Sequence, residues 1–182
     1  MKAMTQKNLM DAFGGESMAH MRYLHFANQA EKEKLPSVQR LFKTIAHAEY
    51  VHAGDHYREL KHLDGGSQAD SGFTVGPGDT LKNLGLAIAG EAFEIAEMYP
   101  VYIEVARFQG EKGAHKTFEW AYKTEQQHKA LFERAKRAVS EGHDMDLDRL
   151  GVCEACGCTL EGALPDFCPI CGAKREKFTV FA

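Results

Sequence analysis

The segment Glu49-Tyr50-Val51-His52 and its counterpart Glu125-Gln126-Gln127-His128 decide the fold that this sequence predicts. In each segment the glutamate and the histidine are three residues apart, so on an α-helix they lie on the same face, one turn from each other. Apolar residues recur at helical spacing around both segments, which places the two polar pairs on the buried faces of their helices. Two Glu-x-x-His pairs that face a core predict a metal site inside a helical bundle.

A lone glutamate precedes each pair, so the sequence contains an internal repeat. Glu16 precedes the first pair, and Glu91 precedes the second at nearly the same separation. Four helices that supply Glu, Glu-x-x-His, Glu and Glu-x-x-His carry the ligand set of di-iron and di-manganese carboxylate proteins. The alternative is that these are surface salt-bridge residues. We disfavour it because every member falls on an apolar stripe, and buried carboxylates without cations would have to take up protons.

One further acidic residue breaks the repeat. Glu94 lies three residues after Glu91 and therefore on the same helix face, whereas Ala19 occupies the matching position after Glu16. The predicted site then contains five carboxylates and two histidines, and two divalent ions would balance only four of the negative charges. Because the fifth carboxylate suits a more oxidised pair of ions, the charge count favours a redox site over two hydrolytic zinc ions.

Apolar periodicity predicts four helices, over residues 5–33, 36–63, 80–108 and 114–140. Asp79 or Thr80 can cap the third helix, because either side chain can accept hydrogen bonds from the first-turn N–H groups. Pro100 lies inside this helix, where we expect a kink and not an end, since the apolar stripe continues beyond it. Residues 64–79 are rich in glycine and lack periodicity, which predicts a long crossover connection. The expected fold is therefore mainly α, a four-helix bundle with a crossover.

All the cysteines lie near the C-terminus, in Cys153-Glu154-Ala155-Cys156-Gly157 and Cys168-Pro169-Ile170-Cys171-Gly172, with Cys158 as an additional thiol. Four thiolates at this spacing can surround one metal ion tetrahedrally. We predict that the four Cys-x-x-Cys thiols are the ligands and that Cys158 is not one. The spacing alone leaves open whether the ion is structural zinc or redox-active iron.

The predicted domain organisation is a bundle over residues 1–142, a polar linker over 143–151 and a metal domain over 152–182. The last segment is too short to form a stable apolar core, so we expect it to need its metal to fold. The linker can reach at most ~30 Å at ~3.3 Å per residue, which is shorter than the predicted bundle. The metal domain could therefore serve its own bundle or that of a neighbouring chain.

Composition excludes several classes of protein. A net charge of −4 and an isoelectric point near 6.1 argue against a nucleic-acid partner, which would require a basic surface. No apolar run approaches the ~20 residues of a membrane span, and the N-terminal segment lacks the apolar core of a signal peptide. The clustered cysteines indicate metal ligands and not a disulfide framework. We expect a protein of the reducing cytoplasm with neither a nucleic-acid nor a membrane partner.

Taken together, these segments resemble the rubrerythrin family. The resemblance rests on Gly15-Glu16-Ser17, Glu49-Tyr50-Val51-His52, Gly90-Glu91-Ala92-Phe93-Glu94, Glu97-Met98-Tyr99-Pro100, Glu125-Gln126-Gln127-His128 and the cysteine pairs. It covers the whole chain in the order of the family, and implies a ferritin-like di-iron bundle followed by a rubredoxin-like iron domain. Cys158, beside the first cysteine pair, departs from the family pattern.

The resemblance also implies a role for each polar residue of the bundle. Glu49 and Glu125 would bridge two irons. Glu16 would bind one of these irons, and Glu91 and His128 would bind the other. His52 and Glu94 would exchange at one iron, with His52 on the ferrous and Glu94 on the oxidised ion. Tyr23 and Tyr99 would donate hydrogen bonds to ligand carboxylates.

The activity implied is that of a peroxidase of oxidative-stress defence, which reduces hydrogen peroxide to water. Electrons would come from a rubredoxin or an NAD(P)H-dependent reductase, through the iron held by Cys153, Cys156, Cys168 and Cys171, in a head-to-tail homodimer. Zinc could substitute for that iron. Two alternatives stay open: a ferroxidase that handles iron, and an interaction module with zinc in the cysteine site and an idle bundle.

Overall fold

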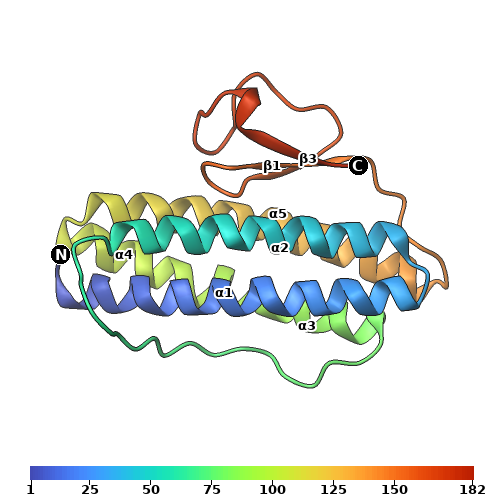
Figure 1. Ribbon diagram of the computed structural model, residues 1–182, viewed down its shortest axis with the longest axis horizontal. Coiled ribbons are helices and arrows are strands. Elements are labelled where there is room, and N and C mark those ends of the chain that lie inside the picture. Colours follow the sequence, from blue (N-terminus) through green and yellow to red (C-terminus); the bar gives the residue numbers. More distant parts are fainter.

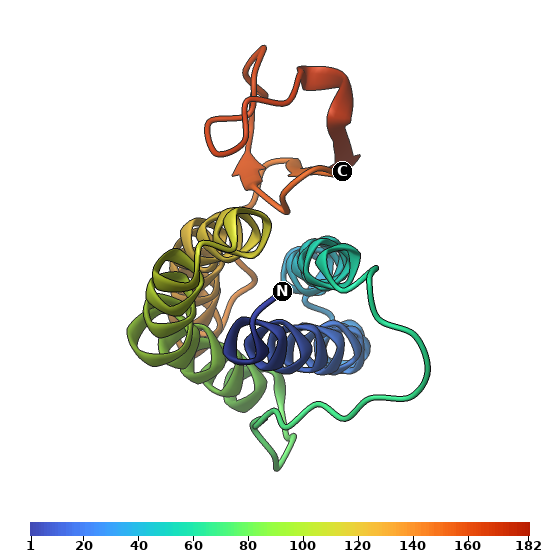
Figure 2. The same ribbon diagram turned by 90° about the vertical axis from the view of Figure 1, so that its left-hand side faces the viewer.

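The computed structural model describes residues 1–182 and confirms the predicted fold class (Figure 1). The helical elements are α1 (Ala3–Lys32), α2 (Pro36–Glu59), α3 (Thr80–Phe93), a π-helical segment η1 (Glu94–Met98), α4 (Tyr99–Gln109) and α5 (Lys112–Ser140). Viewed along the bundle axis, α1 and α2 form one antiparallel pair, and α5 lies beside the α3–α4 segment in the other (Figure 2). None of the helices combines the length and apolarity that crossing a bilayer requires.

The crossover connection runs along the outside of the bundle from the end of α2 to the start of α3 (Figures 1 and 2). At its end the carboxylate of Asp79 accepts a hydrogen bond of 2.8 Å from the backbone N–H of Lys82 and so caps α3, as the sequence predicts. At its middle the backbone N–H of Asp70 donates to Asp11 Oδ1 at 2.8 Å, which fixes this part of the connection on α1.

The third predicted helix is interrupted one turn before the proline that we expected to kink it. Across η1 the backbone N–H of Tyr99 donates to the carbonyl of Glu94, a bond that spans one residue more than in an α-helix. Pro100 has no N–H to continue the α-helical pattern, and the wider turn accommodates its ring. The distortion therefore falls on the residues that include Glu94.

Two apolar clusters hold the bundle together on either side of a polar middle. In the first, neighbouring aromatic rings have centroids 5.2 to 6.2 Å apart: Tyr23, Phe26, Phe42 and Phe132. In the second cluster, the ring centroids of Tyr99, Tyr102 and Phe118 are 5.5 to 6.4 Å apart. Full burial of one such side chain is worth about 1.5–3 kcal/mol, so this packing can stabilise the bundle around a costly polar site.

The C-terminal segment forms a small antiparallel sheet of order β2-β1-β3, with strands β1 (Leu150–Cys153), β2 (Thr159–Glu161) and β3 (Phe178–Phe181). A short helical turn, η2 (Arg175–Lys177), precedes β3. The sheet and its cysteine loops lie over α2 and α5 of the same chain (Figures 1 and 2).

The segment predicted as a polar linker packs against the bundle. Met145 and Leu147 are buried in the first apolar cluster, and the carboxylate of Asp144 accepts hydrogen bonds from the N–H groups of Ser37 and Val38 at the start of α2. The last two residues of the predicted linker, Leu150 and Gly151, belong to β1. These contacts fix where the cysteine domain sits on the bundle.

Candidate dinuclear metal centre

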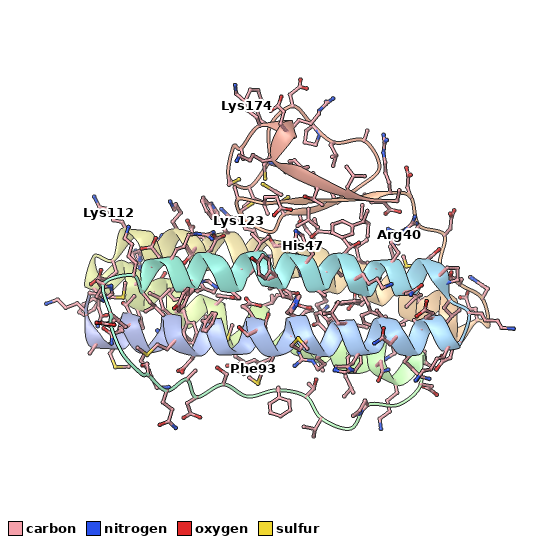
Figure 3. All side chains as sticks on the ribbon, viewed as in Figure 1. Arg40, His47, Phe93, Lys112, Lys123 and Lys174 are labelled. Atoms are coloured by element: carbon pink, nitrogen blue, oxygen red, sulfur yellow. The ribbon has the colours of Figure 1, made fainter.

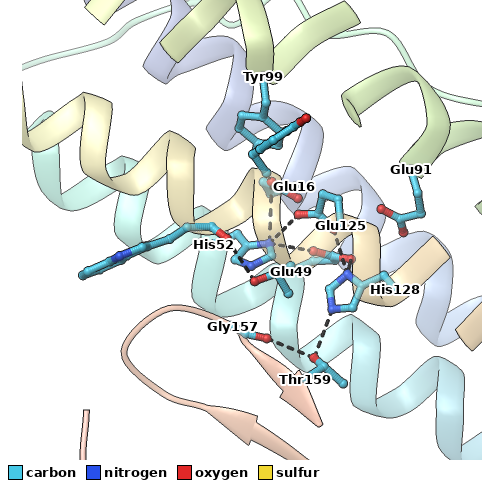
Figure 4. Close-up of polar contacts among 12 residues, drawn as sticks. Glu16, Glu49, His52, Glu91, Tyr99, Glu125, His128, Gly157 and Thr159 are labelled. Atoms are coloured by element: carbon cyan, nitrogen blue, oxygen red, sulfur yellow. Dashed lines mark hydrogen bonds and ion pairs between the residues drawn. The ribbon is translucent and has the colours of Figure 1, made fainter. Parts of the chain in front are cut away.

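Four helices bring the predicted bundle residues together in the polar middle of the bundle (Figure 4). Their ligand atoms form two groups, each with all atoms within 4.8 Å of one another. The first group is Glu16, Glu49, His52 and Glu125; the second is Glu49, Glu91, Glu125 and His128. Because Glu49 and Glu125 belong to both groups, they occupy the positions from which a carboxylate can bridge two ions.

Both histidines direct the same ring atom at the carboxylates. His52 Nδ1 lies 2.9 Å from Glu49 Oε2 and 2.9 Å from Glu125 Oε1. His128 Nδ1 lies 2.7 Å from Glu125 Oε2 and 3.2 Å from Glu49 Oε1. The two Nε2 atoms face the cysteine domain instead (Figure 4). The imidazoles therefore stand between the carboxylate site and the cysteine domain.

Thr159 of the cysteine domain fixes the tautomer of His128. The Thr159 hydroxyl donates its hydrogen to the carbonyl of Gly157 at 2.9 Å, so towards His128 Nε2, at 3.0 Å, it can only accept. The Nε2 atom then carries the proton, which leaves Nδ1 of the neutral ring free as a lone pair facing the carboxylates. A partner of this kind orients the imidazole in many metal sites.

Two buried tyrosines support the lone glutamates in a crossed arrangement. Tyr23, on the helix of Glu16, donates to Glu91 Oε1 at 2.6 Å, whereas Tyr99, on the segment of Glu91, donates to Glu16 Oε1. The sequence suggested that each tyrosine could support a carboxylate but did not show which one. The pKa of both phenols is raised well above 10, mainly by burial and further by the nearby carboxylates. Both tyrosines therefore keep their protons at neutral pH.

The electrostatics of this cluster fit metal cations. All six residues of the two groups are at most 1% exposed. Burial, followed by repulsion from neighbouring carboxylates, raises the pKa of Glu16 and of Glu91 well above its ordinary value. Glu16 Oε2 is buried and has no hydrogen-bond partner in the protein. Two cations would take the place of the protons and would supply the missing partner, and oxygen and imidazole ligands suit iron, manganese or zinc.

Glu94 is near both groups but belongs to neither. It lies on η1 and is partly exposed. Burial of its carboxylate, followed by repulsion from Glu125 and Glu49, raises its pKa well above the ordinary value. In this structure His52, and not Glu94, completes the first group.

Three other histidines make hydrogen bonds within the protein. His20 Nδ1 lies 2.7 Å from the carbonyl of Ala46, and His47 Nε2 lies 2.7 Å from Glu154 Oε1 of the cysteine domain. His56 lies between Thr117 and Tyr99, each at 3.1 Å, and burial lowers its pKa to about 3. A neutral His56 thus forms a second contact with the tyrosine that supports Glu16.

The four predicted cysteine ligands form a third group, which could hold one metal ion in the C-terminal domain. The Sγ atoms of Cys153 and Cys171 are 3.7 Å apart, and those of Cys156 and Cys168 are 3.6 Å apart. A tetrahedral site with metal–sulfur bonds of ~2.3 Å has edges of about 3.8 Å, so these two distances fit zinc or iron. Cys158 is buried beside this group and is not a member of it.

The two centres meet at the first cysteine segment. Gly157 approaches His52 so closely that a Cβ atom on it would lie 2.2 Å from His52 Nε2, and its φ of +74° also favours glycine. The backbone N–H of Thr159 donates to Gln127 Oε1 on α5 at 3.1 Å. The sequence did not identify Thr159 or Gln127, because both act through contacts between distant segments that no spacing encodes.

This geometry defines a class of protein: a four-helix bundle with a buried carboxylate and histidine dinuclear site, joined to a rubredoxin-like four-cysteine domain. Family models agree, since the model described as rubrerythrin matches residues 7–136 and the one for its rubredoxin-like domain matches residues 152–179. The chain belongs to the rubrerythrin family, as the sequence motifs indicated.

Individual relatives cover almost the whole chain. Rubrerythrin-2 of Clostridium acetobutylicum is 43% identical over 98% of this chain and 97% of its own length. Rubrerythrin of Nitratidesulfovibrio vulgaris is 33% identical over 96% of this chain and 92% of its own. A solved structure of nigerythrin in its fully reduced, all-ferrous state superposes with a TM-score of 0.85 at 29% identity, covering 97% of this chain and 86% of that one.

Proposed function

We propose that the chain is a non-haem di-iron peroxidase that reduces hydrogen peroxide to water with electrons delivered through an iron ion held by four cysteines. The observation that carries the proposal is the contact between the two centres, in which Gly157 lies against His52 and Thr159 accepts a hydrogen bond from His128. A centre that only stored metal would not need a second metal centre seated on its imidazoles.

Two bound ferrous ions would supply the two electrons that convert one peroxide and two protons into two waters. Glu49 and Glu125 would bridge them, with Glu16 on one ion, and Glu91 and His128 on the other. His52 would complete the first position, and Glu94 would replace it after oxidation, because a carboxylate suits a more positive ion than a neutral imidazole does. The solved structure of nigerythrin is all-ferrous, and the similarity of this chain to nigerythrin supports the choice of iron here.

Tyr23 and Tyr99 would act through the carboxylates that they contact. Both phenols stay protonated at neutral pH, and each donates to a glutamate of a different metal position. This keeps Glu91 and Glu16 in place when His52 and Glu94 exchange.

The proposal includes a rubredoxin or an NAD(P)H-dependent reductase as the electron donor, a reducing cytoplasmic environment and a head-to-tail homodimer as the assembly. Cys171 is the least buried of the four ligand cysteines, so electrons would enter on its side and leave at Gly157. The two centres already touch within one chain, so this last transfer does not require a partner subunit.

Stopped-flow mixing tests the proposal against the ferroxidase alternative. Fully reduced, iron-loaded protein is mixed anaerobically with hydrogen peroxide or, separately, with dissolved oxygen. We expect faster oxidation by peroxide; faster oxidation by oxygen would establish the ferroxidase. A colourless, zinc-only cysteine site in native protein would overturn the electron route.

The electron route is tested with Cys171→Ser. We expect loss of donor-dependent turnover, while a single oxidation of the pre-reduced dinuclear site proceeds at the normal rate. Cys158→Ser is the matched control, because it changes a buried thiol of the same domain and leaves all four predicted ligands in place. Sustained turnover in Cys171→Ser would contradict the role of this iron as the electron inlet.

A further inference from the structure

A groove of about 320 Å³ leads from the surface to the carboxylate site on the side away from the cysteine domain. It runs between α1, η1 and the crossover connection, and the lining residues that matter here are Gly15, Arg22, Thr74, Gly90, Phe93 and Glu94. Phe93 lies on the opposite side of the bundle from the cysteine domain, near the crossover connection (Figure 3). The volume is enough for several water-sized molecules.

Glu94 is where this groove meets the site. The six residues of the two metal groups are at most 1% exposed, whereas Glu94 is partly exposed and lines the groove. On the other side, Gly157 and Thr159 of the cysteine domain cover both imidazoles. The groove therefore approaches the site from the side that the cysteine domain leaves uncovered.

Two helical glycines keep the groove open. A Cβ atom on Gly15 would meet no other atom within 4 Å, and one on Gly90 would meet only the ends of the Arg22 and Tyr23 side chains at 3.6 Å or more. Glycine weakens a helix relative to alanine, and at Gly15 no close packing requires it. Its effect at this position is to leave space in the wall of the groove.

The walls of the groove carry polar atoms that the protein leaves unpaired. Arg22 Nε and Thr74 Oγ1 are both buried and have no hydrogen-bond partner in the protein. Buried polar groups are almost always satisfied, by water if not by protein. A small polar guest with donor and acceptor atoms would satisfy both, and hydrogen peroxide and water are such guests.

The crossover connection forms a fixed roof over this groove. Ser71 Oγ donates to the carbonyl of Asp11, and the backbone N–H of Asp70 donates to Asp11 Oδ1 at 2.8 Å. Gly14 allows this close approach, because a Cβ atom on it would lie 2.8 Å from Ser71 Oγ. The roof therefore limits the width of any molecule that reaches Glu94.

We propose that this groove is the route by which hydrogen peroxide reaches the dinuclear site, and that its width selects small hydroperoxides. This inference rests on the proposed peroxidase function. It places the arrival of peroxide and the arrival of electrons on opposite faces of one site, so an external electron donor and the substrate do not compete for the same surface.

Gly15→Leu tests the route, because the new side chain starts in open space at the wall of the groove and replaces no proposed ligand. We expect the second-order rate of oxidation of the pre-reduced protein by hydrogen peroxide to fall about tenfold, and that by tert-butyl hydroperoxide to fall further. Reduction of the oxidised site through the cysteine domain should be unchanged. Gly85→Leu on α3 is the matched control, since only the end of the flexible Lys136 side chain lies near that position.

Two further measurements keep the test decisive. Phe93→Ala removes a side chain that is 56% exposed at the groove and should speed oxidation by tert-butyl hydroperoxide relative to hydrogen peroxide. Crystal structures of wild type and Gly15→Leu should show ordered water beside Glu94 in the first and a leucine side chain in its place in the second. Equal peroxide rates for Gly15→Leu and Gly85→Leu would overturn the route. Failure of the wild-type protein to react with peroxide would instead overturn the proposed function.

Discussion

Helix α1 and the α3–η1–α4 segment hold equivalent positions in the bundle, yet only α1 is a continuous α-helix. Both deliver a lone glutamate to the site and a tyrosine to the glutamate of the other. One turn after the glutamate they differ: α1 has Ala19, which is 3% exposed in the apolar core, whereas the second segment has Glu94 on a π-helical turn beside a groove. The repeat thus builds a symmetric metal cage, and the asymmetry is confined to its solvent side.

The largest effect should come from removing either of the two lone glutamates, Glu16 or Glu91. We expect Glu16→Ala and Glu91→Ala each to lose one of the two dinuclear-site ions and to lower peroxide turnover by about a hundredfold or more. Metal content per chain and turnover are measured on the same samples. Glu97→Ala, an exposed residue of η1, should keep both ions. Retention of two ions by only one of the two variants would show that the halves are not equivalent.

A smaller effect is expected from giving α1 a carboxylate at the position that matches Glu94. Ala19→Glu places a carboxylate where α1 packs in the apolar core, and we expect it to lower the free energy of unfolding of the metal-free protein by about 3 kcal/mol. Chemical denaturation measures the change, with Glu97→Ala expected within about 0.5 kcal/mol of wild type. A neutral result for Ala19→Glu would mean that the first half can also accept an extra carboxylate.

Much of this comparison was predictable from the sequence, because local periodicity determines which residues share a helix face. The two Glu-x-x-His segments, the lone glutamates and the extra Glu94 could be placed in one site from the sequence, and the structure brings all of them except Glu94 into the two ligand groups. The crossover connection and the cap at Asp79 also followed from local rules.

What escaped prediction depends on contacts between distant segments. Tyr23 supports Glu91 and not the glutamate of its own helix, since the choice depends on how the helices cross. The distortion lies at residues 94–98 and not at Pro100, because the chain absorbs the missing N–H one turn earlier. Linker length alone could not place the cysteine domain; in the structure Asp144 binds the linker to the start of α2, and the domain itself contacts its own bundle through Gly157 and Thr159.

The crossed tyrosines should give a moderate and unequal effect. Tyr23→Phe leaves one buried carboxylate oxygen without its donor, and we expect a loss of about 1–2 kcal/mol in the free energy of unfolding. Tyr99→Phe also removes the partner of His56 Nε2, so we expect a loss of about 2–3 kcal/mol. Thermal and chemical denaturation of the metal-loaded proteins compare the two. Equal losses would show that His56 contributes nothing to the support of Glu16.

The last expected effect is on the pH dependence of the metal-free protein. The folded-state pKa values of Glu16, Glu91 and Glu94 are raised, first by burial, and those of His52 and His128 are raised because nearby carboxylates outweigh their burial; that of His128 reaches about 9. A raised pKa means that the folded state binds more protons than the unfolded state, so stability falls as pH rises through it. His56, whose pKa is lowered, opposes this only below its unfolded value of about 6.5.

Between about pH 6.5 and 9 we therefore expect the free energy of unfolding of the metal-free protein to fall with rising pH. The metal-loaded protein should show little slope, because cations replace the protons. Glu94→Gln should flatten the metal-free slope by at most about 1.4 kcal/mol per pH unit, whereas Glu97→Gln, at an exposed position, should leave it unchanged. Urea denaturation across this range measures all four slopes. A Glu94→Gln slope equal to that of wild type would contradict the raised pKa of the carboxylate which distinguishes the two halves, because a carboxyl group that is ionised in both the folded and the unfolded state adds nothing to the slope.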